Sequence, residues 1–405
     1  MDKLIRDPTI DTEPNRGDGW QPVLTGDLAA DAVCAAREVA LRLRTPAQVE
    51  AAAGVARQQT AFPRSTHWIS YSAAQGYAGL AVLWGYLDAC FADEGWDVTG
   101  REHLWLAVRG AELVHNPPVG LFSGLSGLAF GVWQLSRGGT RYGRLLARLD
   151  DTISAQATAL ADGLYARNNG MTIGEFDVIS GASGVGAYLL CRRDQPGPSA
   201  ALSAVIRALI HVGDDEGGVP RWHTPAHLLW DEGMKKSYPY GNLNCGLAHG
   251  VPGPLAFLSQ SLRAELTAPG LPETIARMAD FLCDNRYDDE WGVNWPNAVP
   301  IEPAGEADGG TLRAGSAQSA SEGPSRCAWC YGSPGIARAL WLAGEPPIVF
   351  DGGRISQAVE DARHRFADLL PRRRRAVGHH AALRRRDALS RLRRGGPHAR
   401  AATAR

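Results

Sequence analysis

Apolar residues recur along this chain in short blocks, and a Gly-x-x-Gly step precedes each block. Blocks such as LAVLWGYL and LAFGVWQL are apolar nearly all round, which is typical of helices packed on several sides. The first glycines of successive steps are 48, 57, 69 and 82 residues apart, in the order Gly76, Gly124, Gly181, Gly250 and Gly332. This pattern predicts a repeated helix pair with insertions of growing length.

More amphipathic segments lie between the apolar blocks, for example residues 143–160 and 202–211. We expect them to form an outer layer around the apolar helices. The predicted fold class is therefore all-α, an α/α toroid in which a ring of helix pairs closes and its glycine turns face one end. A structural role for the glycines, letting helices approach closely, accounts for most of four of the five steps.

Three regions follow from the pattern. Residues 1–25 are polar and rich in Pro, Gly and Asp, and predict a poorly ordered lead-in. Residues 26–369 form the toroid domain, which begins with one or two helices over 28–58. Residues 370–405 form a basic tail. Within the domain, residues 214–244 and 301–325 are expected to be loops over a peptide-sized cleft, the second of them mobile.

Composition narrows the cellular context. The chain has 405 residues, of which 44% are hydrophobic, enough for a large core. Seven scattered cysteines do not resemble a disulfide framework and favour a reducing cytosol. The start has no apolar signal region, and no run of 18 apolar residues occurs. We expect a cytoplasmic protein without a membrane segment.

The net charge of −1 conceals an uneven distribution. Residues 371–405 hold 12 arginines and a single acid, Asp387, which leaves a net charge of −12 on the first 370 residues. Basic tails of this kind are usually solvated or bind nucleic acid. We expect no nucleic-acid partner here, because the tail has another explanation given below.

Three glycine turns carry reactive side chains. Asp177 lies four residues before Gly181, His249 directly precedes Gly250, and Arg326, Cys330 and Tyr331 precede the last step. An imidazole can transfer protons near neutral pH, and a cysteine at a helix start ionises more easily. A closed ring would bring the three turns together. Taken singly, Asp177 could be a helix N-cap and His249 a structural histidine.

Other motifs have simpler explanations. Cys327-x-x-Cys330 could be half of a structural zinc site or a redox pair, but no second Cys/His pair has similar spacing. The spacing of His223 and His227 suits a helical metal pair, yet Pro225 lies between them. The acidic run 288–290 resembles the magnesium-binding clusters of terpene-type cyclases, but a solvated, turn-like acidic loop is the simpler interpretation.

The glycine turns together with the segments FDVISGASG, GLAHGVPG and RCAWCYGSPG resemble the lanthionine synthetase C family over about residues 70–345. The resemblance implies an α/α toroid with seven repeats and a Zn²⁺ ion held by Cys-Cys-His. It also implies thioether formation between cysteine thiols and dehydroalanine or dehydrobutyrine. Carried onto this chain, Cys330 is the first zinc ligand, Asp177 and His249 are the acid/base pair, and Arg326 and Tyr331 flank the metal.

The resemblance also implies partners. The substrate is a dehydrated precursor peptide, and the partner enzyme is a lanthipeptide dehydratase, with a membrane-associated complex as one arrangement of the two. We expect a stand-alone cyclase. Two other functions stay open: a LanC-like scaffold that binds peptide or partner without catalysis, and an α/α-barrel lyase or hydrolase that relies on Asp288 and Asp289.

The chain departs from the family pattern after Cys330. The pattern requires a Cys-His-Gly motif with the remaining zinc ligands and then a seventh repeat, and this sequence has no cysteine after Cys330. His379 and His380 are poor substitutes for it. The last repeats are therefore expected to be missing or frameshifted, with zinc affinity, activity and solubility reduced.

A one-base shift supplies the missing motif. Residues 370–375, Leu-Pro-Arg-Arg-Arg-Arg, can be encoded as CTG CCA CGG CGC CGC CGG, and the shifted frame reads TGC CAC GGC GCC GCC, which is Cys-His-Gly-Ala-Ala. We predict that resequencing of the gene around codon 370 finds these or synonymous codons compatible with the shift. Codons that cannot encode Cys-His-Gly in the shifted frame would rule the frameshift out.

Overall fold

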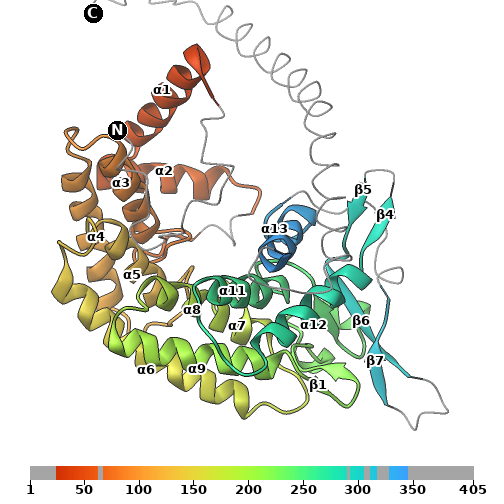
Figure 1. Cartoon of the computed structure of the whole chain (residues 1–405). Helices are drawn as coiled ribbons and strands as arrows, with labels where there is room; N and C mark the ends of the chain where they lie inside the picture. The colour runs from red at the N-terminus through yellow and green to blue at the C-terminus, as the bar shows by residue number, and fades with distance from the viewer. Residues whose placement is uncertain (1–23, 63–66, 290–291, 305–310, 317–327, 345–405) are drawn as a thin grey trace, which may run out of the picture.

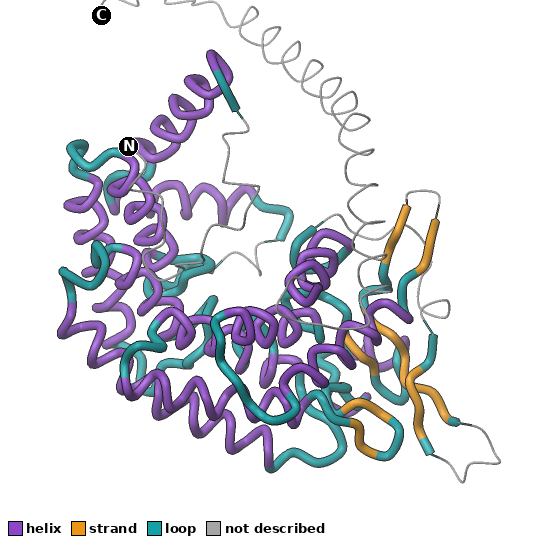
Figure 2. Tube along the Cα trace, in the orientation of Figure 1, coloured by secondary structure: helices purple, strands orange, loops and turns teal. Residues whose placement is uncertain are grey.

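A computed structural model describes residues 24–62, 67–289, 292–304, 311–316 and 328–344 (Figure 1). Helices dominate these ranges, and the strands lie between residues 215 and 314, where the largest insertions occur (Figure 2). The predicted fold class, an α/α toroid, is confirmed. The lead-in up to residue 23, Arg326, Cys327 and the whole tail from residue 345, including His379 and His380, fall outside the described residues.

The inner layer consists of helices that begin at the predicted glycine turns. They are α3 (Tyr77–Cys90), α5 (Leu125–Gln134), α8 (Ala182–Cys191), α11 (Pro252–Arg263) and α13 (Ser333–Gly344). Each contacts the next one along the chain, so that they follow the arc seen in Figure 1. Their apolar surface is explained by neighbours on several sides: Trp84 of α3 and Leu189 of α8 are completely buried.

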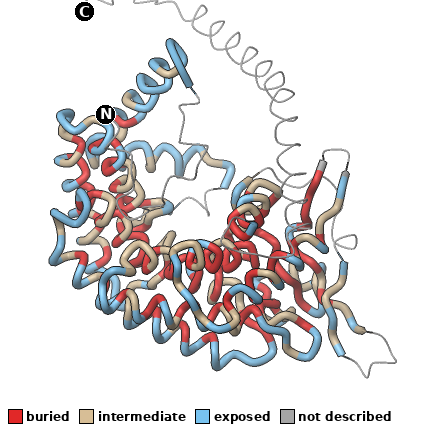
Figure 3. Tube along the Cα trace, in the orientation of Figure 1, coloured by how far each residue is buried: buried red, intermediate tan, exposed pale blue. Residues whose placement is uncertain are grey.

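The outer layer consists of longer amphipathic helices, each packed on the inner helix that precedes it: α4 (Trp96–Glu112), α6 (Gly143–Tyr165), α9 (Pro196–Val212) and α12 (Leu271–Asp284). Both predicted outer segments are helical: α6 begins at the predicted residue and continues to Tyr165, and α9 is longer than predicted at both ends. In α12 the buried residues Leu271, Ile275, Met278 and Leu282 recur at helical spacing. Figure 3 shows buried positions facing the inner layer and exposed ones facing outward.

Two further helices, α1 (Gly26–Arg42) and α2 (Pro46–Gln59), occupy the segment predicted to hold one or two helices. Thr45 and Gln48 form a capping box at the start of α2, with Pro46 at its first position. These features explain why the helical run breaks at residues 43–45.

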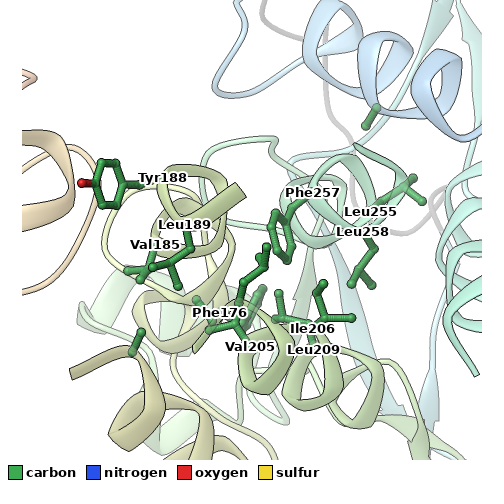
Figure 4. Close-up of a cluster of buried hydrophobic side chains, with 14 of the residues drawn as sticks. Phe176, Val185, Tyr188, Leu189, Val205, Ile206, Leu209, Leu255, Phe257 and Leu258 are labelled. Atoms are coloured by element: carbon green, nitrogen blue, oxygen red, sulfur yellow. The ribbon is translucent and has the colours of Figure 1, made fainter. Parts of the chain in front are cut away.

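A cluster of buried hydrophobic side chains lies between α8, α9 and α11 (Figure 4). Phe257 of α11 reaches the backbone of α8 at Gly186, where an added Cβ would lie 2.5 Å from its ring. Val205 and Leu209 of α9 and Leu255 and Leu258 of α11 are completely buried. Full burial of one such side chain contributes roughly 1.5–3 kcal/mol. This core supports the two turns that carry Asp177 and His249.

The second glycine of each step lies against the carbonyl group six residues before it. An added Cβ would lie 2.0 to 2.1 Å from that oxygen at Gly79, Gly127, Gly184 and Gly335, and 3.1 Å from it at Gly253. No side chain fits at the four tighter positions, so the glycines let each inner helix start directly on its own turn.

The turns are joined to one another by backbone hydrogen bonds. The four bonds run from Ala74 N–H to Phe122 O (2.9 Å), Phe122 N–H to Ile179 O (3.0 Å), Val178 N–H to Ala248 O (3.1 Å) and Ala248 N–H to Cys330 O (3.3 Å). We call this series the turn belt. Each bond links one of the five glycine turns to the next, so all five lie at the same end of the arc, as the repeat predicts.

The insertion at 214–244 is structured rather than a plain loop. It contains β1 (Asp215–Glu216), β2 (Val219–Pro220), η2 (Ala226–Leu228), α10 (Glu232–Ser237) and β3 (Asn242–Asn244). β3 pairs with β6 (Ala298–Pro303), and β6 pairs with β7 (Leu312–Ala314), both antiparallel. One face of this sheet is apolar and buried, and it is formed by Leu243, Val299 and Ile301.

Two sequence expectations in this region were wrong. Residues 301–303 and 312–314 of the expected mobile loop belong to β6 and β7, because their antiparallel pairing with each other, next to the pairing of residues 298–300 with β3, outweighs a composition rich in Gly, Ala and Pro. Asp288 and Asp289 lie in β4 (Tyr287–Asp289), paired with β5 (Gly292–Asn294), rather than in a turn. Glu290 lies outside the described residues.

Among the helices that the structure describes, none is both long and apolar enough to cross a membrane.

The glycine contacts lead to a prediction about stability. A Cβ at Gly184 would lie 2.0 Å from the Val178 carbonyl oxygen and 2.9 Å from Leu121 Cβ, whereas one at Gly163 of α6 meets nothing within 4 Å. We expect Gly184→Ala to lower the free energy of unfolding by about 2 kcal/mol or more. Gly163→Ala should raise it by roughly 0.5–1 kcal/mol. Urea denaturation measures both, and similar effects of the two would contradict the packing role of Gly184.

Candidate active site

The turns before α8, α11 and α13 come together at one point of the turn belt. Ala248, in the turn before α11, links the turns before α8 and α13. Its carbonyl accepts from Val178 N–H, and its N–H donates to Cys330 O. The residues beside these backbone contacts are Asp177, His249 and Tyr331. The structure thus brings together three of the predicted site residues, although 72 positions separate Asp177 from His249 and 82 separate His249 from Tyr331.

Asp177 is 1% exposed and uses both carboxylate oxygens. Its Oδ1 accepts from the N–H groups of Ser180 and Gly181 at 2.7 and 2.8 Å. Its Oδ2 lies 2.6 Å from His249 Nδ1. The N-cap interpretation is therefore half right. The Asp177 carboxylate caps the turn into α8, although the N-cap residue of the helix is Gly181. The second oxygen of the carboxylate is bound to the imidazole.

A short helix delivers Asp177 to this position. α7 (Ile173–Phe176) begins with a capping box between Thr172 and Glu175, and Phe176 is completely buried. The Asp177 N–H closes the turn by donating to Ile173 O. Because the backbone is held on both sides, the carboxylate has little freedom to leave the imidazole.

His249 is half-buried, with its side chain 33% exposed. A carboxylate only accepts hydrogen bonds, so the proton of the 2.6 Å bond belongs to Nδ1 in the neutral ring, and Nε2 carries the lone pair. The imidazole ring centroid is 6.2 Å from that of Tyr331. The arrangement can move a proton at Nε2 while Asp177 fixes the tautomer and stabilises the cation.

Tyr331 is held by groups of the His249 segment. Its hydroxyl oxygen accepts from Asn244 Nδ2 at 2.9 Å. Its ring lies against Gly246, where an added Cβ would be 2.7 Å from Cδ1 and Cε1. Sequence analysis gave Asn244 no role. The available signal was a pair of asparagines, Asn242 and Asn244, at strand spacing directly before the GLAHG segment, and both are buried in β3.

Further aromatic side chains lie on or near the turns of the site. Phe122 and Trp329 stack with ring centroids 5.6 Å apart, although they come from the second and fifth turns. Trp329 is 47% exposed, next to Cys330. From the insertion, Tyr238 has a raised pKa because of burial, with smaller contributions from nearby Cys245 and Tyr331.

The described residues do not form the implied zinc site. Cys330 is a half-buried free cysteine, and no group of three His, Cys, Asp or Glu side chains within the described ranges could hold a metal ion. Three protein ligands are the usual minimum for a catalytic zinc site. The predicted neighbour Arg326 lies outside the described ranges.

The remaining candidates have structural environments. His223 is buried, its Nδ1 lies 2.7 Å from Pro220 O, and burial lowers its pKa; His227 is exposed. Cys245, beside the His249 turn, is completely buried, and burial raises its pKa to about 12. A thiol with that pKa is a poor metal ligand or nucleophile near neutral pH.

Comparisons with known proteins agree with this architecture. A family model described as lanthionine synthetase C-like protein matches residues 67–368. Nisin biosynthesis protein NisC of Lactococcus lactis subsp. lactis is 27% identical over 228 residues, which are 55% of this chain and 50% of that protein. This chain therefore aligns with about half the length of that curated relative. Superposition on a solved structure of nisin cyclase gives a TM-score of 0.61 at 19% sequence identity. The match covers 80% of this chain and 75% of the nisin cyclase chain, which supports the fold.

The two roles of the Asp177 carboxylate can be separated by mutation. Asp177→Ala removes the acceptor for two backbone N–H groups and should lower the free energy of unfolding by about 2–4 kcal/mol. Asp177→Asn keeps an acceptor oxygen for Ser180 and Gly181 and should cost about 1 kcal/mol. Asp151→Ala, which removes an exposed aspartate from α6, serves as the control. It should change the free energy of unfolding by no more than about 0.5 kcal/mol. Equal losses for the two Asp177 variants in urea denaturation would exclude the capping role.

Proposed function

Because the chain belongs to the lanthionine synthetase C-like family, we propose that it is a peptide thioether cyclase acting on a dehydrated precursor peptide. The reaction joins a cysteine thiol to dehydroalanine or dehydrobutyrine and forms lanthionine or methyllanthionine. The observation that carries the proposal is the 2.6 Å bond between the buried Asp177 and half-buried His249, in the turn cluster that also holds Tyr331 and Cys330.

The chemistry requires proton transfer at two atoms. The thiol loses a proton, its sulfur bonds to the β-carbon, and the π electrons of the C=C bond move toward the carbonyl oxygen to give an enolate. The α-carbon then takes up a proton, and the carbonyl is restored. No proton is gained or lost overall, so one group that accepts and then donates a proton is sufficient.

His249 suits this role. Its Nδ1 is committed to Asp177, and its Nε2 is the nitrogen that can exchange a proton with substrate. Asp177 would stabilise the imidazolium that forms between the two transfers, because it is buried and already held by two backbone N–H groups. Half-exposure of the ring lets a peptide approach it.

The role of zinc is limited by the ligands at hand. A bound zinc ion would lower the pKa of the substrate thiol, and Cys330 would be one of its ligands. The described residues supply no further ligand set, so we assign the proton transfers only to the protein's own side chains. Arg326 is proposed to flank the site.

The lack of cysteine after Cys330 favours a second candidate function. In it, the chain is a catalytically inactive scaffold that binds the dehydrated peptide or a lanthipeptide dehydratase. Both candidates require a dehydratase upstream, because dehydroalanine and dehydrobutyrine arise from serine and threonine by loss of water.

The proposal predicts a specific loss of cyclisation in variants of the pair. A synthetic peptide with a cysteine and a dehydroalanine is incubated with enzyme and zinc, and free thiols are counted by alkylation and mass spectrometry, since ring closure leaves the peptide mass unchanged. His249→Asn and Asp177→Asn should lower the rate about 100-fold or more, because each removes part of the proton-transfer unit.

A matched histidine serves as the control. His115 is exposed on the loop after α4, and His115→Asn should leave the rate unchanged. Unaltered cyclisation by folded His249→Asn would refute the proposed mechanism. Peptide binding without ring closure by the wild-type chain would establish the scaffold function instead.

A further inference from the structure

Asn244 is a buried amide beside the proposed proton-transfer pair, and neither of its side-chain ends faces solvent. The residue is 4% exposed, at the end of β3, where it pairs with Ala298 of β6. Its carbonyl accepts from Val251 N–H at 3.1 Å, and an added Cβ at Gly250 would lie 2.1 Å from that oxygen. The backbone of Asn244 is thus clamped between the sheet and the start of α11.

The hydrogen bonds of the side chain define which end faces Tyr331. Oδ1 accepts from Gly246 N–H at 2.9 Å, and a backbone N–H can only donate. The Nδ2 group therefore faces the Tyr331 hydroxyl, 2.9 Å away, and donates to its oxygen. Since Nδ2 has no acceptor capacity, the phenol proton cannot point back at Asn244.

Tyr331 is also oriented by its ring. Its ring lies against Gly246, and its centroid is 6.2 Å from that of the His249 ring, which places the phenol within the turn cluster. Only glycine allows this contact at position 246, because an added Cβ would lie 2.7 Å from the Tyr331 ring. Both Asn244 and Gly246 thus act on the same side chain, one through the hydroxyl and the other through the ring.

We propose that Asn244 is a positioning residue: it turns the Tyr331 hydroxyl so that its proton is directed at the carbonyl oxygen of the dehydro residue. This deepens the proposed cyclase function and rests on it. As the C–S bond forms at the β-carbon, the π electron pair moves onto this oxygen, which gains negative charge. A hydrogen bond from Tyr331 would stabilise the enolate until the α-carbon is protonated.

Reversal of the side-chain polarity tests the assignment. Asn244→Asp keeps the shape and the acceptor for Gly246 N–H, but replaces the donor facing Tyr331 with an acceptor, so the phenol proton turns toward residue 244. With the peptide assay above, we expect kcat to fall roughly 100-fold and KM to change little, because the lost interaction belongs to the transition state.

A double-mutant cycle shows whether the effect passes through the phenol. Tyr331→Phe should lower kcat by a similar factor, and Asn244→Asp combined with Tyr331→Phe should be no slower than Tyr331→Phe alone. If the two losses multiply, or if either single variant keeps the wild-type kcat, the proposal is overturned. A KM increase at constant kcat would also overturn it.

Folding and the parent function are checked separately. Urea denaturation shows whether Asn244→Asp is folded; if it is not, Asn244→Ser, which keeps a hydroxyl near Gly246 but is too short for Tyr331, replaces it in the cycle. His249→Asn distinguishes failure of this inference from failure of the proposed cyclase function. Loss of cyclisation in His249→Asn with independent Asn244 and Tyr331 effects would overturn only this inference, whereas full activity of His249→Asn would overturn the proposed function.

Discussion

The structure depends on backbone hydrogen bonds that join each glycine turn to the next. Helix packing alone fixes the distance between helices but tolerates sliding along their axes. A bond such as Ala248 N–H to Cys330 O fixes the height of one turn relative to its neighbour. Because these bonds connect main-chain atoms, the level of the turns is independent of which side chains they carry. Reactive residues could therefore be placed on some turns without disturbing the others.

The first and third turns differ in how a polar side chain at the same position is used. Ser72 and Asp177 each lie four residues before the first glycine of their step. The Ser72 hydroxyl accepts from the N–H groups of Ala74 and Gln75 and donates to Phe122 O, so all its capacity is used within the turns. The Asp177 carboxylate accepts two N–H groups with one oxygen and has a second oxygen for His249. Both side chains thus accept from two N–H groups of their own turn, and only the carboxylate has a second oxygen left for an imidazole.

The parts of the fold that sequence could predict are those encoded by periodicity. Five glycine steps with apolar blocks predicted the inner helices and the common end at which Asp177, His249 and Tyr331 meet. The strands at 301–303 and 312–314 pair with each other and could not be predicted, because local composition favours a loop and because β3, which pairs with residues 298–300 of β6, lies more than 50 residues earlier in the chain. Asn244 was missed for a similar reason: its significance comes from a contact with Tyr331, 87 residues later.

The largest insertions support the turns that carry His249 and Tyr331. The spacing between steps grows along the chain, and the longest insertions precede the turns of His249 and Tyr331. β3 ends with Asn244 and passes directly into the His249 turn, so sheet pairing with β6 fixes the backbone from which His249 starts. Precise placement of a proton donor requires such rigid surroundings. The sheet insertion is therefore better understood as part of the support of the site than as a loop that merely covers it.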